Sequence, residues 1–175
     1  MSAAEFSHIV TLAEAAQGRS VRLEADERAR AAIATRLDLV ALDRFVVTAE
    51  VRAVAGEIAA KGAVEAAVVQ SCAATALPVP AKLSEPFDLR FLKGAEPVVD
   101  PDEEIEISDG DCDILPLEDD RIDLGEAAVQ TLSLALDPFP RHPDADRILA
   151  EKGVLSEEQA GPFAALAKLH GKPDA

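Results

Sequence analysis

The sequence predicts an α+β fold: an antiparallel β meander, strongly curved, packed with a helix from the N-terminal half and a later amphipathic helix. Three consecutive segments show the two-residue alternation of half-buried strands, and one helical pattern stands before them and another after. The 175 residues are 49% hydrophobic and 29% charged, which is a globular composition. Helices and strands are segregated along the chain rather than alternating, and this favours α+β over α/β.

The three strand segments follow one another closely. Apolar and polar residues alternate from Phe45 to Ala53 and again from Ile58 to Val68, with Gly56 between the two runs. Two strands joined so closely predict an antiparallel hairpin, and a third run from Leu83 to Phe91 extends it to a meander. Gly62, inside the second run, predicts a bulge or a strong bend.

Helices are predicted on both sides of the meander. Asp26 is a suitable N-cap for a helix whose apolar stripe includes Ile33. Asp123 is placed to cap the later helix, with Glu126 at the spacing of a capping box. Pro138 ends that helix.

Shorter elements are expected near the two ends. The segments 6–10 and 21–23 are predicted as short strands that flank a turn near Gly18. A short helix with proline in its first turn is predicted over 162–169. The expected organisation is a single α+β domain over residues 1–140, including an acidic connecting segment at 96–122, and a C-terminal extension over 141–175.

Charge is concentrated in one part of the chain. The formal net charge is −16, and residues 96–126, called the acidic segment below, contain 14 acidic residues with Arg121 as their single base, a net charge of −13. Like charges that repel predict a solvated connection, whereas a functional reading is attraction of a basic partner. Binding of nucleic acid over a broad surface is disfavoured, because such binding depends on Lys and Arg.

Composition limits the location and the chemistry. No apolar stretch is long enough for a membrane helix, no secretory signal is evident, and two cysteines make no disulfide framework, so a reduced, cytoplasmic protein without a membrane is expected. The sequence has no glycine-rich phosphate loop and no nucleophile elbow, and His8, His142 and His170 are scattered. We therefore predict no catalytic residue and no enzyme.

Metal ligands are also few. The run 109–113 places carboxylates at alternate positions, but a calcium loop requires Gly and Glu where Ile114 and Asp120 stand. Cys72 and Cys112 cannot by themselves complete a thiolate site. No metal and no cofactor is predicted, and Cys72 is expected to be a small buried side chain.

Three separated pieces of the chain resemble one family. They are the strand end at 70–75, the helix start at 121–126 that continues to a proline-rich exit at 136–140, and the terminal 162–166. Their order and spacing resemble the YceD-like family of bacteria and plastids, which is associated with accumulation of large-subunit ribosomal RNA, and most closely its alphaproteobacterial branch. The residues that carry the resemblance are Cys72, Asp123, Leu124, Gly125, Glu126, Pro138 and Pro140.

The chain departs from the family pattern at its cysteines. Many members have a C-x-x-C pair at the end of this strand, and some have a further cysteine after the proline-rich exit. Here Thr75 takes the second position, and the region after Arg141 contains His142 but no cysteine. The metal site that the resemblance implies is therefore not transferred to this chain.

The resemblance implies a non-enzymatic factor in assembly of the large ribosomal subunit. Because the chain is acidic, we expect it to bind a basic ribosomal protein or a pre-large-subunit particle, and not RNA itself, through the segment 100–120. The expected contact residues are Asp100, Asp102, Glu103, Glu104, Glu106, Asp109, Asp111, Asp113, Glu118, Asp119 and Asp120. Asp123 and Glu126 are expected mainly to cap the helix.

Two alternatives stay open at this point. The first is direct RNA binding by an arginine face that would form after folding. Its residues would be Arg28, Arg30, Arg36, Arg44, Arg52 and Arg90. The second is a metal-binding protein with a regulatory role, built on the aspartates and Cys72. The sequence does not decide the oligomeric state.

Overall fold

The structure is a computed structural model that describes residues 5–93 and 113–154. The described chain forms two compact units. The first contains residues 5–70, 80–93 and 113–137, and the second contains residues 71–79 and 138–154. Within these ranges no helix is long and apolar enough to cross a membrane. The predicted helix over 162–169 lies outside the described residues.

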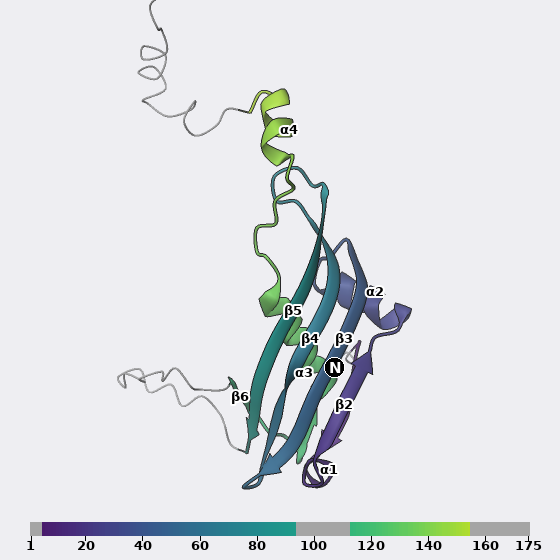
Figure 1. The fold of residues 1–175 in the computed structure, drawn as a ribbon, viewed down its shortest axis with the longest axis vertical. Helices are drawn as coiled ribbons and strands as arrows, with labels where there is room; N and C mark the ends of the chain where they lie inside the picture. Colours follow the sequence, from purple (N-terminus) through teal and green to yellow (C-terminus); the bar gives the residue numbers. More distant parts are fainter. Residues whose placement is uncertain (1–4, 94–112, 155–175) are drawn as a thin grey trace, which may run out of the picture. The chain divides into compact units, whose positions relative to one another are not determined.

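A five-stranded mixed sheet forms the centre of the first unit, in the order β2-β3-β4-β5-β6 (Figure 1). Its strands are β2 (Arg19–Glu24), β3 (Ala41–Val54), β4 (Glu57–Ser71), β5 (Pro78–Leu92) and β6 (Asp113–Pro116). The pairs β2–β3 and β3–β4 are antiparallel, whereas β5 and β6 are parallel. The α+β class and the three neighbouring long strands are confirmed. The parallel fifth strand was not predicted.

The expected strong curvature is wrong, because neither sheet is strongly curved or closed. Gly62 lies opposite Ala49 in continuous register, and the register shift lies between Leu42 and Arg44 instead. A Cβ atom added to Gly62 would lie 2.0 Å from the backbone oxygen of Thr48 and 2.9 Å from the ring of Phe87. The glycine therefore permits close approach of neighbouring atoms and does not bend the strand.

The hairpin between β3 and β4 has a two-residue turn. Val54 pairs with Glu57, and Ala55 and Gly56 between them both have positive φ, 53° and 86°. This is the geometry of the tight turns that match the twist of a hairpin, and glycine adopts it without a Cβ clash. The predicted hairpin is confirmed.

A small second sheet joins the N-terminal segment to the start of the later helix. β1 (Ile9–Thr11) pairs antiparallel with β7 (Arg121–Asp123), and Val10 lies opposite Ile122. The short helix α1 (Leu12–Ala15), which was not predicted, separates β1 from β2 and has a complete capping box between Thr11 and Glu14. The predicted turn at Gly18 is present, with φ of 69°, but the two short strands that it separates do not pair with each other.

The two longer helices of this unit supply one core together with the sheet. They are α2 (Glu27–Arg36) and α3 (Leu124–Ala135). Ile33 of α2, Phe45 of β3 and Leu132 of α3 are fully buried in one hydrophobic cluster. Asp26 accepts a hydrogen bond from the N–H of Ala29 at 2.8 Å, so the predicted cap is confirmed.

The second unit contains a turn and a helix. The N–H of Cys72 donates to the carbonyl of Leu77, and the N–H of Ala73 donates to the carbonyl of Pro140. The helix α4 (Ala145–Glu151) follows the proline-rich segment and was not predicted. Its N-cap, Asp144, makes no side-chain capping hydrogen bond.

Candidate functional site

The described part of the acidic segment begins at Asp113. Four of the eleven expected contact residues lie within the described residues, namely Asp113, Glu118, Asp119 and Asp120. Seven lie outside them, namely Asp100, Asp102, Glu103, Glu104, Glu106, Asp109 and Asp111. Their role as contacts stays a prediction.

Two of the four described acids have basic neighbours. Asp119 pairs with Arg121 at 3.1 Å, and Asp120 pairs with Lys93 at 2.6 Å. Both aspartates have positive φ, 50° and 56°, in the turn before β7, a conformation that aspartate tolerates better than most residues. Their side chains are more than half exposed, so these ion pairs add little stability and can exchange partners.

Asp123 of the family motif fastens the N-terminal segment to α3. One carboxylate oxygen accepts from the hydroxyl of Ser7 at 2.6 Å, and the other accepts from the N–H of His8 at 2.9 Å. That second oxygen also accepts from the N–H of Glu126 at 3.1 Å, which is the N-cap bond that the sequence predicts. A single carboxylate thus caps the helix and holds a segment more than a hundred residues away in sequence.

The next two motif residues have packing roles. Leu124 is completely buried, and its N–H donates to the carbonyl of His8 at 2.9 Å. A Cβ atom at Gly125 would lie 2.3 Å from the carbonyl oxygen of Phe6 and 3.0 Å from the nitrogen of His8. Only glycine lets the N-terminal backbone lie against the first turn of α3.

Glu126 does not complete the predicted capping box. Arg36 of α2 donates two hydrogen bonds to its carboxylate, at 2.6 and 2.8 Å, and a third to Glu5 at 3.2 Å. The hydrogen bonds from Arg36 lower the pKa of the Glu126 carboxyl and raise the pKa of the guanidinium. The expectation that Glu126 mainly caps the helix is therefore wrong, because its side chain joins α3 to α2 instead.

The arginines of the RNA-binding alternative are spread over three elements. Arg28, Arg30 and Arg36 lie on α2, Arg44 and Arg52 on β3, and Arg90 on β5. Arg44 and Arg52 are eight residues apart on one strand, which corresponds to about 26 Å.

Several of these guanidinium groups already have partners within the protein. Arg44 pairs with Glu65 at 3.1 Å, and Arg52 pairs with Glu50 at 2.9 Å. Arg30 donates to the carbonyl of Ala25 at 2.8 Å. Together with the pair between Arg36 and Glu126, these contacts place carboxylates beside the arginines of the sheet and of α2. The arginines therefore do not form a surface of positive charge alone.

In the second unit, Cys72 is only 3% exposed, as expected for a small buried side chain. The N–H of His142 donates to its sulfur at 3.3 Å. The neighbouring side chain of Thr75, followed by that N–H, lowers the pKa of the Cys72 thiol to about 7. Among the described residues, the buried Thr75 hydroxyl has no other hydrogen-bond partner.

Two of these groups stand at the positions where the resemblance implies a C-x-x-C pair. Cys72 is at the first position and Thr75 at the second, and the region after the proline-rich exit contains His142 and Asp144 but no cysteine. Among the residues that the structure describes, no group of three or more His, Cys, Asp and Glu side chains could hold a metal ion.

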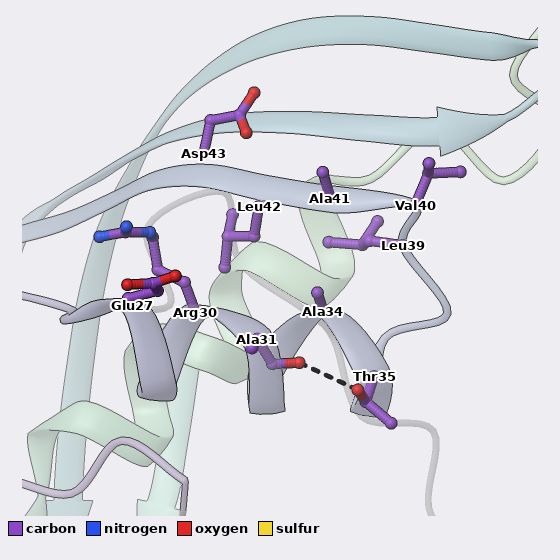
Figure 2. A pocket seen from close by; sticks show the side chains of 10 residues that line it. All are labelled: Glu27, Arg30, Ala31, Ala34, Thr35, Leu39, Val40, Ala41, Leu42 and Asp43. Carbon is purple, nitrogen blue, oxygen red and sulfur yellow. Dashed lines mark hydrogen bonds between the residues drawn. The ribbon is translucent and has the colours of Figure 1, made fainter.

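A groove of the first unit lies between α2 and the start of β3. It has a volume of about 450 Å³. Figure 2 shows Leu39 and Leu42 between the helix and the strand, with Asp43 pointing away from the helix. The only side-chain hydrogen bond drawn there joins the hydroxyl of Thr35 to the carbonyl of Ala31 within the helix. We assign no chemistry to this groove.

The fold and these sites describe a small acidic α+β protein whose most specific sequence motif holds the N-terminal segment against a helix. A comparison with protein families matches residues 60–170 to the large ribosomal RNA subunit accumulation protein YceD. The chain belongs to this family. Comparisons with curated proteins and with solved structures found no match.

Proposed function

We propose that the protein is a non-enzymatic ribosome-biogenesis factor that supports accumulation of large-subunit ribosomal RNA by binding a basic ribosomal protein or a pre-large-subunit particle. The family supplies the context of the large subunit. The observation that carries the mechanism is the charge of the acidic segment, −13 of the total −16. The proposed contact is residues 100–120.

The physical reason is electrostatic. Ribosomal proteins that bind RNA are cationic, and a dense group of carboxylates accelerates encounter with a cation at long range. The same carboxylates would neutralise the basic protein until ribosomal RNA, which carries one charge per nucleotide, displaces them. Such binding must weaken as salt screens the charges, since the screening length is about 8 Å at physiological ionic strength.

Direct RNA binding is the weaker alternative. Arg36, Arg44 and Arg52 are engaged by carboxylates of the same chain. Phosphate contacts would have to displace these carboxylates, and the acidic segment would repel the nucleic acid. A gel shift with fragments of large-subunit RNA tests this alternative, and binding at low salt would revive it.

Two features of the sequence support assignment of the chain to one branch of the family. The alanine-rich helix that starts after Asp26 and the Asp-Pro-Phe-Pro-Arg exit at 137–141 favour the alphaproteobacterial branch of the family. A family tree built from aligned sequences tests this placement, and grouping with another branch would contradict it.

Capture from lysate at low and at high salt tests the proposed function. The tagged protein should retain one or more large-subunit ribosomal proteins at low salt and release them at high salt. A variant with Asn or Gln at the eleven contact positions, which changes the charge of the acidic segment from −13 to −2, should retain none. The control carries Glu50→Gln, Glu57→Gln and Glu65→Gln and should behave as the unmodified protein. Failure to capture a ribosomal protein, or capture insensitive to salt, would contradict the proposal.

A further inference from the structure

A second groove of the first unit lies where β5, the start of β6 and the end of α3 meet. Its volume is about 310 Å³, at the small end for binding pockets, so it suits a few side chains better than a whole small molecule. Glu85, Pro86, Phe87 and Asp88 of β5 form one wall. Asp113 of β6 and the α3 residues Thr131, Leu134 and Ala135 complete the lining.

The apolar part of this groove includes an unusually exposed side chain. Leu134 is 86% exposed, more than any other large hydrophobic residue that the structure describes. Phe87, across the groove, is 8% exposed and belongs to the core. A leucine on the rim of a groove, with an aromatic ring and Pro86 nearby, is a suitable place for an apolar side chain of a partner.

Among the residues that the structure describes, β6 covers only part of the β5 edge at this groove. β6 pairs with β5 only from Leu89 to Leu92, so within the described residues no strand covers residues 80–88 on that side. Pro86 has no N–H group, which limits the backbone ladder that an added strand could form here. We therefore expect side chains of a partner, more than its backbone, to make the contacts.

The charged residues of the lining are all acidic. Glu85, Asp88 and Asp113 line the groove, and no Lys or Arg does. Asp88 pairs with Lys61 at 3.0 Å, but both side chains are at least half exposed, so the pair is weak. The carboxylates of Glu85 and Asp113 make no hydrogen bond or ion pair with other described residues. A lining of this charge is complementary to Lys and Arg side chains.

Residues 96–112 of the same chain are a poor occupant of the groove. Residues 96–112 contain eight acidic residues and no Lys or Arg, so like charges would be brought together in the groove. A second copy of this acidic protein is disfavoured for the same reason. The remaining occupant that fits both the charge and the apolar rim is a cationic segment of another protein.

We propose that this groove binds an extended, cationic segment of the partner protein, with an apolar side chain beside Leu134 and Lys or Arg side chains at Glu85 and Asp113. This inference rests on the proposed function, and adds to it a place on the folded part of the chain and a requirement for an apolar side chain. Asp113 belongs both to the predicted contact residues and to the lining of the groove.

Photo-cross-linking tests the groove. The full-length protein carries p-benzoylphenylalanine in place of Leu134, or of Val54 at the β3–β4 hairpin as a control, since Val54 is also well exposed, at 57%. Each is irradiated with the protein mixture extracted from purified bacterial large subunits, and the products are identified by mass spectrometry. A cross-link from position 134, and not from position 54, to a basic ribosomal protein is expected. Cross-linking to a second copy of the chain would overturn the inference.

Charge variants separate the groove from the proposed function. Glu85→Gln with Asp113→Asn should weaken binding of the cross-linked ribosomal protein about fivefold, which corresponds to about 1 kcal/mol for the two exposed ion pairs together. Glu27→Gln with Asp43→Asn, which removes the same charge at the groove between α2 and β3, is the control and should have little effect. If the unmodified protein binds and both variants bind equally well, the groove is wrong and the function stands. If the unmodified protein captures no ribosomal protein, both are wrong.

Discussion

Replacement of Gly125 by alanine should destabilise the protein, although alanine is the better helix former. In a helix interior the change from glycine to alanine usually stabilises by about 0.5–1 kcal/mol. Here the new Cβ atom would lie 2.3 Å from the carbonyl oxygen of Phe6, so the N-terminal backbone must move. The structure therefore predicts the opposite sign from helix propensity.

The size of the effect follows from the contacts that depend on this close approach. Three hydrogen bonds join His8 and Ser7 to Asp123 and Leu124, and each is worth about 1 kcal/mol. Allowing for partial relaxation and for the propensity gain, we expect a loss of about 2–3 kcal/mol in the free energy of unfolding. For a domain of this size, that corresponds to a fall in Tm of roughly 4–12 °C.

Urea unfolding and thermal unfolding, both followed by circular dichroism, measure this loss. The matched control is Ser133→Ala, an exposed position of the same helix, which should be neutral or slightly stabilising. Hydrogen exchange at the N–H of His8 should also become faster in Gly125→Ala, because its acceptor Asp123 would lie further away. An alanine variant as stable as the unmodified protein would show that the N-terminal segment does not lie against Gly125.

Two other changes test the ion pair and the thiol. Because hydrogen bonds from Arg36 lower the pKa of the Glu126 carboxyl, this pair stabilises the fold above the ordinary carboxyl pKa of about 4.3 and loses its effect as pH falls through the lowered value. Glu126→Gln should therefore lower the free energy of unfolding by about 1 kcal/mol at neutral pH and by almost nothing in acid. The control is Glu65→Gln, which breaks an exposed ion pair with Arg44 and should change the free energy of unfolding little at any pH. In a protein that also carries Cys112→Ser, Thr75→Val should raise the pKa of Cys72 from about 7 toward the usual value of about 8.5. The ultraviolet absorbance of the thiolate, followed against pH, measures this pKa. An unchanged midpoint would exclude Thr75 as the cause of the low pKa.

The sequence was most informative where one local signal determines the structure. Asp26 and Asp123 cap helices at the predicted positions, and both halves of the β3–β4 hairpin follow from alternation around Gly56. These signals depend on residues close together in sequence. The fold class followed from their order.

Features that depend on distant partners were missed or misassigned. The strand β6 has four residues and stands within an acidic stretch, and only its pairing with β5 makes it a strand. Gly62 was expected to bend its strand, but it accommodates the backbone of Thr48 and the ring of Phe87. Which of these roles an interior glycine has depends on what packs against it.

The same limit applies to the motif and to the candidate site. Asp123 caps its helix as predicted, but its bonds to Ser7 and His8 join residues far apart in sequence. Glu126 was expected to fold back on the cap, and Arg36 of another helix binds it instead. The groove beside Leu134 is lined by residues of three elements that are far apart in sequence, so no local sequence pattern predicts it.

Ribosome profiles of living cells provide the decisive measurement for a charge-based role in subunit assembly. The chromosomal copy would carry Asn or Gln at the eleven acidic contact positions, with protein level and folding checked by immunoblotting and circular dichroism. We predict reduced large subunits and reduced large-subunit ribosomal RNA, to the level of a deletion strain. Large-subunit levels equal to those of the unmodified strain would contradict the role of these carboxylates.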